Sequence, residues 1–280
     1  MKIIRYINTA KLIEEDNNYY ILKPRKIEIE DIYSNLINRN FNNFLSPIEI
    51  NNSYEKYEFI NELNSSDDDR SNDIVYLMSL LHNKTTSFNE VNENELKTRF
   101  EEIIKILDET YEYYSNLQNN IEEEIYMSPA EQLLMNNISK IYYLLNISRK
   151  NIEDYYEIIS NKKVERKSII HGNLKMNHIL ESKEKYLISW NNSKKEIPVY
   201  DLVKFYKNEY EKIELSSLYE NYKSKYKLNE EEENLFISLI SIPNIIKLDK
   251  TNYIDCININ GLVDYVDKTI AFISKQNQKD

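Results

Sequence analysis

Residues that could do chemistry gather in three short segments in the second half of the chain. Residues 171–180 read HGNLKMNHIL, residues 188–191 read ISWN, and residues 198–202 read PVYDL. Asn173 can accept a hydrogen bond but is not a base near neutral pH, and Ser189 offers a neutral hydroxyl. His178 adds an imidazole, which is poorly matched to Mg²⁺. These side chains favour hydrogen bonding over proton transfer or magnesium binding.

The three segments resemble the motifs of the aminoglycoside-phosphotransferase and choline-kinase branch of the protein-kinase-like superfamily, including its spore-coat members. Those motifs read approximately H-G-D-L-H-x-x-N-I-L, then I-D-W-E, then D-L-x-x-x-Y, and their spacing and apolar framework fit this chain. The likeness is most specific over residues 169–206, moderate around residues 80–83 and weak before residue 60. It implies an α+β fold with a small β-rich amino-terminal lobe and a larger, mostly helical lobe.

The resemblance also identifies what this chain lacks. Phosphoryl transfer needs a carboxylate near the acceptor hydroxyl and hard oxygen ligands for Mg²⁺. The family motif implies an aspartate where Asn173 stands, a Mg²⁺-binding asparagine where His178 stands and a metal-binding aspartate where Ser189 stands. Asn177 adjoins His178, but a strand neighbour would point to the opposite face, and Asn191 replaces the motif glutamate. These departures predict that Mg²⁺-ATP turnover is lost and that no metal is bound.

Two residues of the motif are expected to be structural. By the resemblance, His171 braces the catalytic loop through hydrogen bonds, with a catalytic role as the alternative. Asp201 is similar to the family aspartate that packs behind the loop and starts a helix, and a simple helix cap is the alternative. His82, His171 and His178 lack Cys or acidic neighbours at metal-ligand spacing, so they could form a transition-metal site only if the fold brought them together by chance.

Lys23, in the segment YILKPR, aligns loosely with the strand lysine that pairs with nucleotide phosphates in active relatives. The resemblance implies an acidic partner on the following helix, at Glu28, Glu30 or Asp31. A solvated surface lysine is the alternative. Lys23 is therefore a candidate for weak nucleotide binding, which could occur without Mg²⁺.

The segments before residue 73 predict a small β-rich lobe. Alternation and turn residues predict a strand over residues 2–7, a hairpin of residues 11–14 and 19–23 ended by Pro24, and a strand pair of residues 44–50 and 54–60. Helical spacing predicts a helix over residues 31–41. The polar stretch 64–72 reads as a linker, which divides the chain into lobes of residues 1–66 and 67–280.

Helical periodicity dominates the larger lobe. Long apolar stripes begin at Ile74 and Leu96. Ser128, Pro129 and Glu131 form a helix start signal, and the buried face of that helix is expected to run through Leu145. One β interruption is expected there, a hairpin of residues 178–181 and 186–190 that holds the motif residues.

Composition excludes several classes of protein. A net charge of −11 disfavours nucleic acid and anionic membranes as partners. The chain has only 2 Gly, which rules out a Walker A loop and a dinucleotide-binding turn. The amino terminus lacks a signal-like apolar run, so the cytoplasm is the expected location. The single cysteine, Cys256, is expected to be a buried structural thiol and not a nucleophile.

The leading hypothesis is a catalytically inactive kinase-like protein, or pseudokinase, that scaffolds or binds protein partners and has no cofactor. The resemblance to spore-coat members makes coat assembly its specific version. The alternative is an ATP-dependent small-molecule phosphotransferase with substituted residues, in which Glu181 or Glu184 serves as metal ligand. A third hypothesis is a sensor that binds nucleotide without Mg²⁺.

Overall fold

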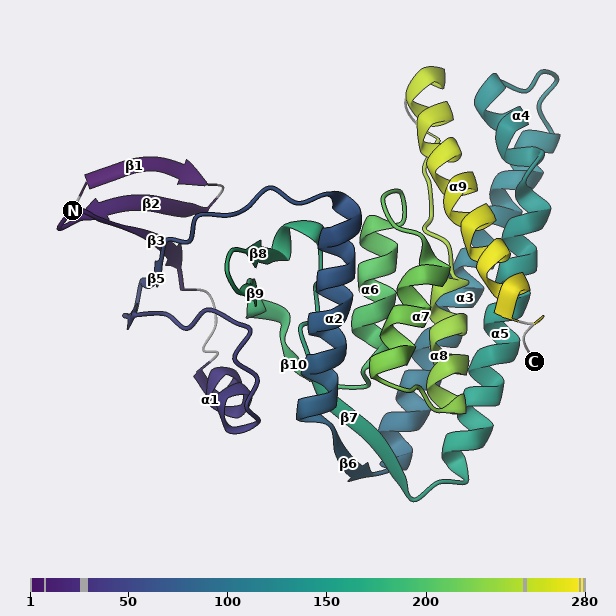
Figure 1. The fold of residues 1–280 in the computed structure, drawn as a ribbon. Coiled ribbons are helices and arrows are strands. Elements are labelled where there is room, and N and C mark those ends of the chain that lie inside the picture. Colours follow the sequence, from purple (N-terminus) through teal and green to yellow (C-terminus); the bar gives the residue numbers. More distant parts are fainter. Residues whose placement is uncertain (1, 8, 26–29, 249–250, 277, 279–280) are drawn as a thin grey trace.

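A smaller and a larger lobe make up the chain (Figure 1). The structure is a computed structural model that describes residues 2–7, 9–25, 30–248, 251–276 and 278. The smaller lobe is an antiparallel sheet accompanied by a helix, and the larger lobe is mostly helical. The predicted α+β fold with a small β-rich lobe and a larger helical lobe is confirmed.

The small lobe is built from short strands and a helix, which are β1 (Lys2–Ile7), β2 (Ala10–Glu15), β3 (Asn18–Pro24), α1 (Glu30–Asn38), β4 (Glu49–Ile50) and β5 (Tyr54–Glu58). The strand order is β1-β2-β3-β5-β4. The turn between β2 and β3 places Asp16 and Asn17 at φ 50° and 62°, a conformation that Asp and Asn tolerate well in hairpin turns. The predicted first strand and hairpin are confirmed.

The strand expected over residues 44–50 is wrong for most of its length. Only Glu49–Ile50 pairs as β4. Pro47 lacks a backbone N–H and cannot donate to a ladder. Phe44 instead makes an isolated parallel bridge to Leu187 of the large lobe, so this segment joins the two lobes.

Most of the expected linker is helical. Helix α2 (Asp67–Thr85) starts inside the stretch 64–72, and Ser66 Oγ accepts a hydrogen bond from the Asp69 N–H at 3.1 Å. The three aspartates of the first turn favour the positive end of the helix dipole, which explains why so polar a segment folds as helix. Its first residue coincides with the start of the second lobe in the predicted division at residue 67.

The remaining helices of the large lobe are α3 (Glu93–Glu122), α4 (Pro129–Met135), α5 (Ile138–Ser160), α6 (Val199–Glu209), α7 (Leu215–Lys225), α8 (Glu230–Ile240) and α9 (Asn252–Gln276). The Ser128–Glu131 capping box is confirmed. The helix that it starts does not continue through Leu145. Asn137 leaves helical geometry at φ −120°, and its side chain donates to the Leu133 carbonyl at 2.9 Å, which separates α4 from α5. None of the helices among the described residues is long and apolar enough to cross a membrane.

A second sheet in the large lobe was not predicted. Strands β6 (Ser87–Glu90), β7 (Val164–Ile170) and β10 (Lys194–Glu196) pair in the order β10-β7-β6. The expectation of one β interruption is therefore wrong. The charged residues of β7 make it difficult to recognise as a strand from the sequence, because the partners that neutralise their charges lie far away in the chain. Glu165, for example, is buried and accepts from Arg99 of α3 at 3.1 Å.

The motif hairpin is present, although its strands are shorter than predicted. It consists of β8 (Ile179–Glu181) and β9 (Lys185–Leu187), flanked by the 3₁₀ turns η1 (Met176–His178) and η2 (Trp190–Asn192). Asn177 lies exposed in η1, so it is not the strand neighbour of His178 that the sequence suggested. The hairpin lies between the small lobe and α2 (Figure 1).

Candidate functional site

Asp201 organises the loop that follows β7. It lies in the first turn of α6 and is completely buried. Its carboxylate accepts from the backbone N–H groups of His171 at 2.6 Å and Gly172 at 2.7 Å, and it contacts His82 Nε2 at 3.2 Å. A buried carboxylate is tolerated when such donors replace its hydration. The arrangement fixes the backbone of the motif loop from behind.

His171 holds the loop to the next strand. Its Nε2 donates to the Ile188 carbonyl at 2.8 Å, and its Nδ1 accepts from the Asn173 N–H at 3.4 Å. A carbonyl can only accept, so Nε2 carries the proton. Burial lowers the pKa of His171, which keeps the ring neutral. Both ring nitrogens are therefore used in bracing the loop.

Gly172 is required by the close approach of another chain segment. Its φ is +81°, which favours glycine, and a Cβ built there would lie 2.2 Å from the carbonyl oxygen of Asn192. Any other side chain at this position would push the motif loop away from η2. One of only two glycines in the chain thus stands where the fold demands it.

The three histidines do not form a metal site. His82 uses Nδ1 to contact the Tyr222 hydroxyl at 2.7 Å and Nε2 to contact Asp201. Within the described ranges, no three His, Cys, Asp or Glu side chains are grouped so that they could hold a metal ion. His171 and His178 do lie near each other, with ring centroids 5.6 Å apart.

Asn173 and His178 face each other across the loop. His178 Nδ1 donates to the backbone carbonyl of Asn173 at 2.6 Å, so Nδ1 carries the proton and the Nε2 lone pair is not used in this bond. Burial, followed by the nearby His171, lowers the pKa of His178 to about 4. The side-chain amide of Asn173 has no hydrogen-bond partner among the described residues. These two positions therefore carry neutral groups.

Ser189 adopts a left-handed backbone conformation, with φ 73° and ψ 51°. This conformation is costly for any residue with a Cβ, by about 1 kcal/mol or more. Its hydroxyl makes no hydrogen bond to another described residue. The tight turn at Ser189 brings the next residue, Trp190, back into the core, where its Nε1 donates to the Leu187 carbonyl at 3.0 Å.

Aromatic rings connect this site to the small lobe. Trp190 lies 5.0 Å from the ring of His171 and 6.2 Å from that of Phe44, which stacks at 5.2 Å on Tyr33 of α1. The distances join ring centroids, and they lie in the usual range for aromatic pairs. These ring contacts connect α1 of the small lobe, through Phe44 and Trp190, to His171 of the motif loop.

Lys23 lies on β3 opposite Glu55 of β5. Its ammonium is 5.2 Å from the centre of the Tyr57 ring, and burial lowers the pKa of Lys23 while Glu55 opposes this effect. Lys23 also contributes to lowering the pKa of His178, which places the two side chains within electrostatic reach.

An acid that was not among the expected ones lies opposite Lys23, while two of the three expected acids cannot be compared. Asp31 is exposed, Glu28 lies outside the described residues, and so does the side chain of Glu30. Glu55 is buried instead and accepts from the Tyr57 hydroxyl at 2.5 Å. The sequence predicted strands that contain Lys23 and Glu55 in one small sheet lobe. It did not predict the register between these strands, which is what sets Glu55 opposite Lys23.

The carboxylates proposed as substitute metal ligands are engaged elsewhere. Glu181 is buried, accepts from Ser65 Oγ, and pairs with Arg70 at 3.5 Å. Its Oε1 has no hydrogen-bond partner among the described residues. Glu184 is exposed and accepts from the Tyr186 hydroxyl at 2.8 Å. Glu181 ties the hairpin to the segment between the lobes.

No protein-family model matches this sequence, and no curated protein sequence matches it. Solved structures do match. An aminoglycoside phosphotransferase from Alicyclobacillus acidocaldarius aligns with a TM-score of 0.72 and 11% identity, over 100% of this chain and 93% of the other. The AMP-bound complex of a spectinomycin phosphotransferase aligns with a TM-score of 0.52 and 13% identity, over 96% and 92%. At such identities the likeness concerns the fold, and this chain has the protein-kinase-like fold found in aminoglycoside phosphotransferases.

Proposed function

We propose that this chain is a kinase-like protein that binds without catalysing Mg²⁺-dependent phosphoryl transfer. The observation that carries the proposal is the chemistry of three positions at the motif loop, where Asn173, His178 and Ser189 offer an amide, a neutral imidazole and a hydroxyl. Mg²⁺ prefers anionic oxygen ligands and an octahedral shell. Without them, the charge that develops on the transferring phosphoryl group is not stabilised.

The surroundings support the same conclusion. Asp201, which lies behind the loop, is buried and bonded to backbone N–H groups, so it cannot also face a metal ion in the cleft. Glu181 is bonded to the segment between the lobes. Loss of the charge clamp typically reduces the rate by several powers of ten.

Nucleotide binding without Mg²⁺ is part of this proposal. We infer that the Lys23 ammonium contacts a phosphate group of the nucleotide; Lys23 is half-buried on β3 and is one of the groups that lower the pKa of His178. A solved neighbour, the spectinomycin phosphotransferase, was crystallised with AMP and in a further complex with ADP and spectinomycin. By the same fold, the cleft of this chain would take an adenine nucleotide.

Thermal denaturation of the full chain with ATP, in Mg²⁺ and in EDTA, tests the proposal. We expect any stabilisation to be the same in both buffers and to be lost in Lys23→Met, which keeps the apolar stem of the side chain. Lys2→Met is the matched control, because Lys2 is exposed in the same sheet. Stabilisation that requires Mg²⁺ and is accompanied by phosphate transfer to an amino alcohol, sugar or aminoglycoside would overturn the proposal.

A variant that carries the residues of the family motif provides the positive control. Replacing the three residues with those of the family motif, as Asn173→Asp, His178→Asn and Ser189→Asp, should create a Mg²⁺-dependent shift in the ATP titration that the natural chain lacks. The comparison separates a missing ligand set from a cleft that rejects nucleotide altogether. If neither protein responds to ATP, only the scaffold role survives.

The second candidate is a small-molecule phosphotransferase with substituted residues. It is favoured by the alignment over the whole chain with the Alicyclobacillus enzyme at a TM-score of 0.72. It would need a carboxylate that moves into the cleft, and Glu181→Gln would then abolish transfer. Under the leading proposal, Glu181→Gln changes only the stability of the protein.

We further propose that the binding role acts on a protein partner, with assembly of a spore coat as its specific form. The sequence resemblance to spore-coat members supports this step. Purification of the tagged full chain from its native cells, before and during sporulation, tests it. Coat proteins that co-purify only during sporulation are the expected result, and a chain recovered alone at both stages would contradict it.

A further inference from the structure

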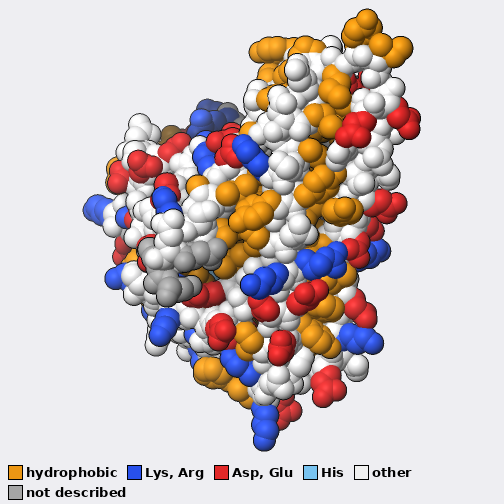
Figure 2. Space-filling model, turned by 90° about the vertical axis from the view of Figure 1, so that its right-hand side faces the viewer, with side chains coloured by type: hydrophobic (Ala, Val, Ile, Leu, Met, Phe, Trp, Pro, Cys, Tyr) orange, Lys and Arg blue, Asp and Glu red, His pale blue; other side chains and the backbone are white. Residues whose placement is uncertain are grey.

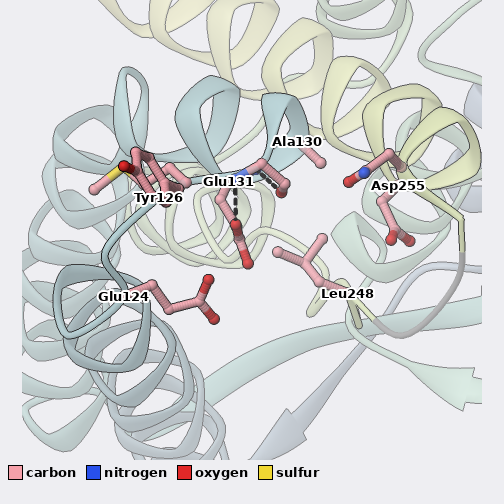
Figure 3. A pocket seen from close by; sticks show the side chains of 9 residues that line it. Glu124, Tyr126, Ala130, Glu131, Leu248 and Asp255 are labelled. Atoms are coloured by element: carbon pink, nitrogen blue, oxygen red, sulfur yellow. Dashed lines mark hydrogen bonds between the residues drawn. The ribbon is translucent and has the colours of Figure 1, made fainter.

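A cavity lies at the end of the large lobe, among α3, α4 and α9. Its volume is about 460 Å³, within the range of small-molecule sites. The side chains that matter for its chemistry are those of Glu124, Tyr126, Glu131, Leu248 and Asp255 (Figure 3). It lies on different elements from Lys23 on β3, from the motif loop after β7 and from Asp201 on α6.

Asp255 is the residue that points to a ligand. It lies in the first turn of α9, is only 5% exposed, and its Oδ1 has no hydrogen-bond partner among the described residues. Figure 3 shows its carboxylate directed into the cavity. A buried carboxylate oxygen without a donor is costly, so a cation or donor bound in the cavity would relieve this cost.

The position of Asp255 at a helix start does not account for its burial. Acidic residues favour the first turn of a helix because of the helix dipole. An exposed aspartate would obtain the same benefit without losing its hydration. The dipole therefore explains an acid in this turn, but not why its Oδ1 is buried without a donor.

Two further carboxylates share the cavity. Glu131 uses Oε2 to accept from the Ser128 N–H at 2.6 Å in the capping box, while Glu124 is exposed. In Figure 3, Glu124 and Glu131 lie on one side of Leu248 and Asp255 lies on the other. Among the described residues that line the cavity, none is Lys, Arg or His. The described walls of the cavity are thus acidic and carry no positive charge of their own.

The spacing of these acids excludes a bare metal ion. No three acidic side chains in the described part of the chain are close enough to coordinate one. The cavity is much larger than a single ion, and Tyr126, Met127 and Leu248 provide apolar walls. Acidic groups set apart by apolar walls suit an organic cation with a short hydrocarbon body.

We propose that this cavity binds an ammonium or guanidinium group carried on a short alkyl chain, with the Asp255 carboxylate accepting its hydrogen bond. Such a group belongs either to a free amine or to a lysine or arginine side chain of another protein. Exposed hydrophobic side chains surround the site, with Ile125 89%, Tyr126 87% and Tyr253 75% exposed. Figure 2 shows hydrophobic side chains gathered at this upper end of the helical lobe.

Calorimetric titration of the full chain tests the proposal. The probes are cadaverine and agmatine as free amines, N-acetyl-lysine amide as the side-chain form, and 1,5-pentanediol as the neutral analogue. We expect at least one cationic probe to bind and the diol not to bind. Binding by the free amines alone identifies a small molecule as the source, and binding by the lysine amide alone identifies a protein side chain.

Asp255→Asn is the deciding variant, and we expect it to weaken binding of the cationic probe at least tenfold. Asp264→Asn is the matched control. Asp264 also lies on α9, but it is half exposed and pairs with Lys268 at 2.8 Å outside the cavity. No binding by any cation, or equal binding by the natural chain and Asp255→Asn, overturns the proposal.

The test does not depend on how well Asp255→Asn folds. An amide needs no bound cation, so the melting temperature of this variant without ligand should equal or exceed that of the natural chain. Glu124→Gln provides a second variant on an exposed side chain, and its affinity should fall several-fold. Unchanged affinity in Glu124→Gln would also contradict the proposal. The nucleotide titration of the motif site is independent of both results.

Discussion

The two sides of the motif loop differ in how completely their polar groups are bonded. On the buried side, Asp201 receives two backbone N–H groups and contacts His82, and His171 uses both ring nitrogens. On the cleft side, the side chains of Asn173 and Ser189 have no hydrogen-bond partner among the described residues.

The difference shows that the two sides of the motif loop are under different physical requirements. The buried side must satisfy every polar group, since an unpaired group there destabilises the fold. On the other side, Asn173 and Ser189 are half-buried, and we expect that they can be replaced without unfolding the protein. A kinase-like fold can therefore persist after its metal ligands are lost, which is the relation we propose here.

Removal of the Asp201 carboxylate is the strongest test of the difference between the two sides of the motif loop. Asp201→Ala leaves two backbone N–H groups and His82 without their acceptor, so we expect a loss of about 3–5 kcal/mol in the free energy of unfolding. Asn173→Ala, on the cleft side, should change it by no more than about 0.5 kcal/mol. Urea denaturation measures both. Similar losses in the two variants would remove the distinction between the two sides.

Gly172→Ala tests the close approach on the buried side. The new Cβ would lie 2.2 Å from the Asn192 carbonyl oxygen, and φ +81° is unfavourable for alanine. We expect a loss of about 2–4 kcal/mol in unfolding free energy. Gly261→Ala is the control, because its Cβ would meet only the Tyr210 hydroxyl at 3.2 Å, and its effect should stay within about 1 kcal/mol. Equal effects would show that the loop can shift.

Acid should weaken the fold through His178. Its pKa is lowered from 6.5 to about 4 in the folded state, so the unfolded chain takes up a proton first as the pH falls. The titration of His178 has no effect on the free energy of unfolding above pH 6.5 and lowers it as the pH falls from 6.5 to about 4. For this half-buried group we expect about 1 kcal/mol after solvent screening. Melting curves of His178→Gln should show a shallower decline over this range, and parallel curves would contradict the assignment.

The smallest expected effect concerns Ser189. Because this residue is held at φ 73°, Ser189→Gly should relieve strain and stabilise the protein by up to about 1 kcal/mol. Ser189→Ala serves as the control, since it removes the hydroxyl but retains the strained Cβ. If glycine destabilises the protein as much as alanine does, the serine hydroxyl and not the backbone governs this turn.

Local patterns were sufficient for much of the fold. The strand Lys2–Ile7, the first hairpin, the Ser128 capping box and the motif hairpin all depend on neighbours in sequence, and all are present. Their signals lie within a few residues of one another. Short-range periodicity and helix capping can be recognised in the sequence without knowledge of the rest of the structure.

The errors share a different cause. Strand β7 pairs with β6 although Ser87 and Lys167 are far apart in sequence, and its charges find partners on distant helices. The helix expected to run from Ser128 was divided by the side chain of Asn137, which bonds back to Leu133. Glu55 faces Lys23 only because of the register between β3 and β5. Each of these outcomes depends on contacts that cannot be recognised from a short stretch of sequence.

The sequence by itself determined which chemical groups stand at positions 173, 178 and 189, and no fold can turn an amide and a hydroxyl into carboxylates. The tertiary structure decided which groups meet. It gave Asp201 three donors from two separate segments and left Asp255 Oδ1 buried without a donor among the described residues. The reason is physical: the type of a side chain is covalent, whereas its burial and its hydrogen-bond partners arise from packing between residues distant in the chain.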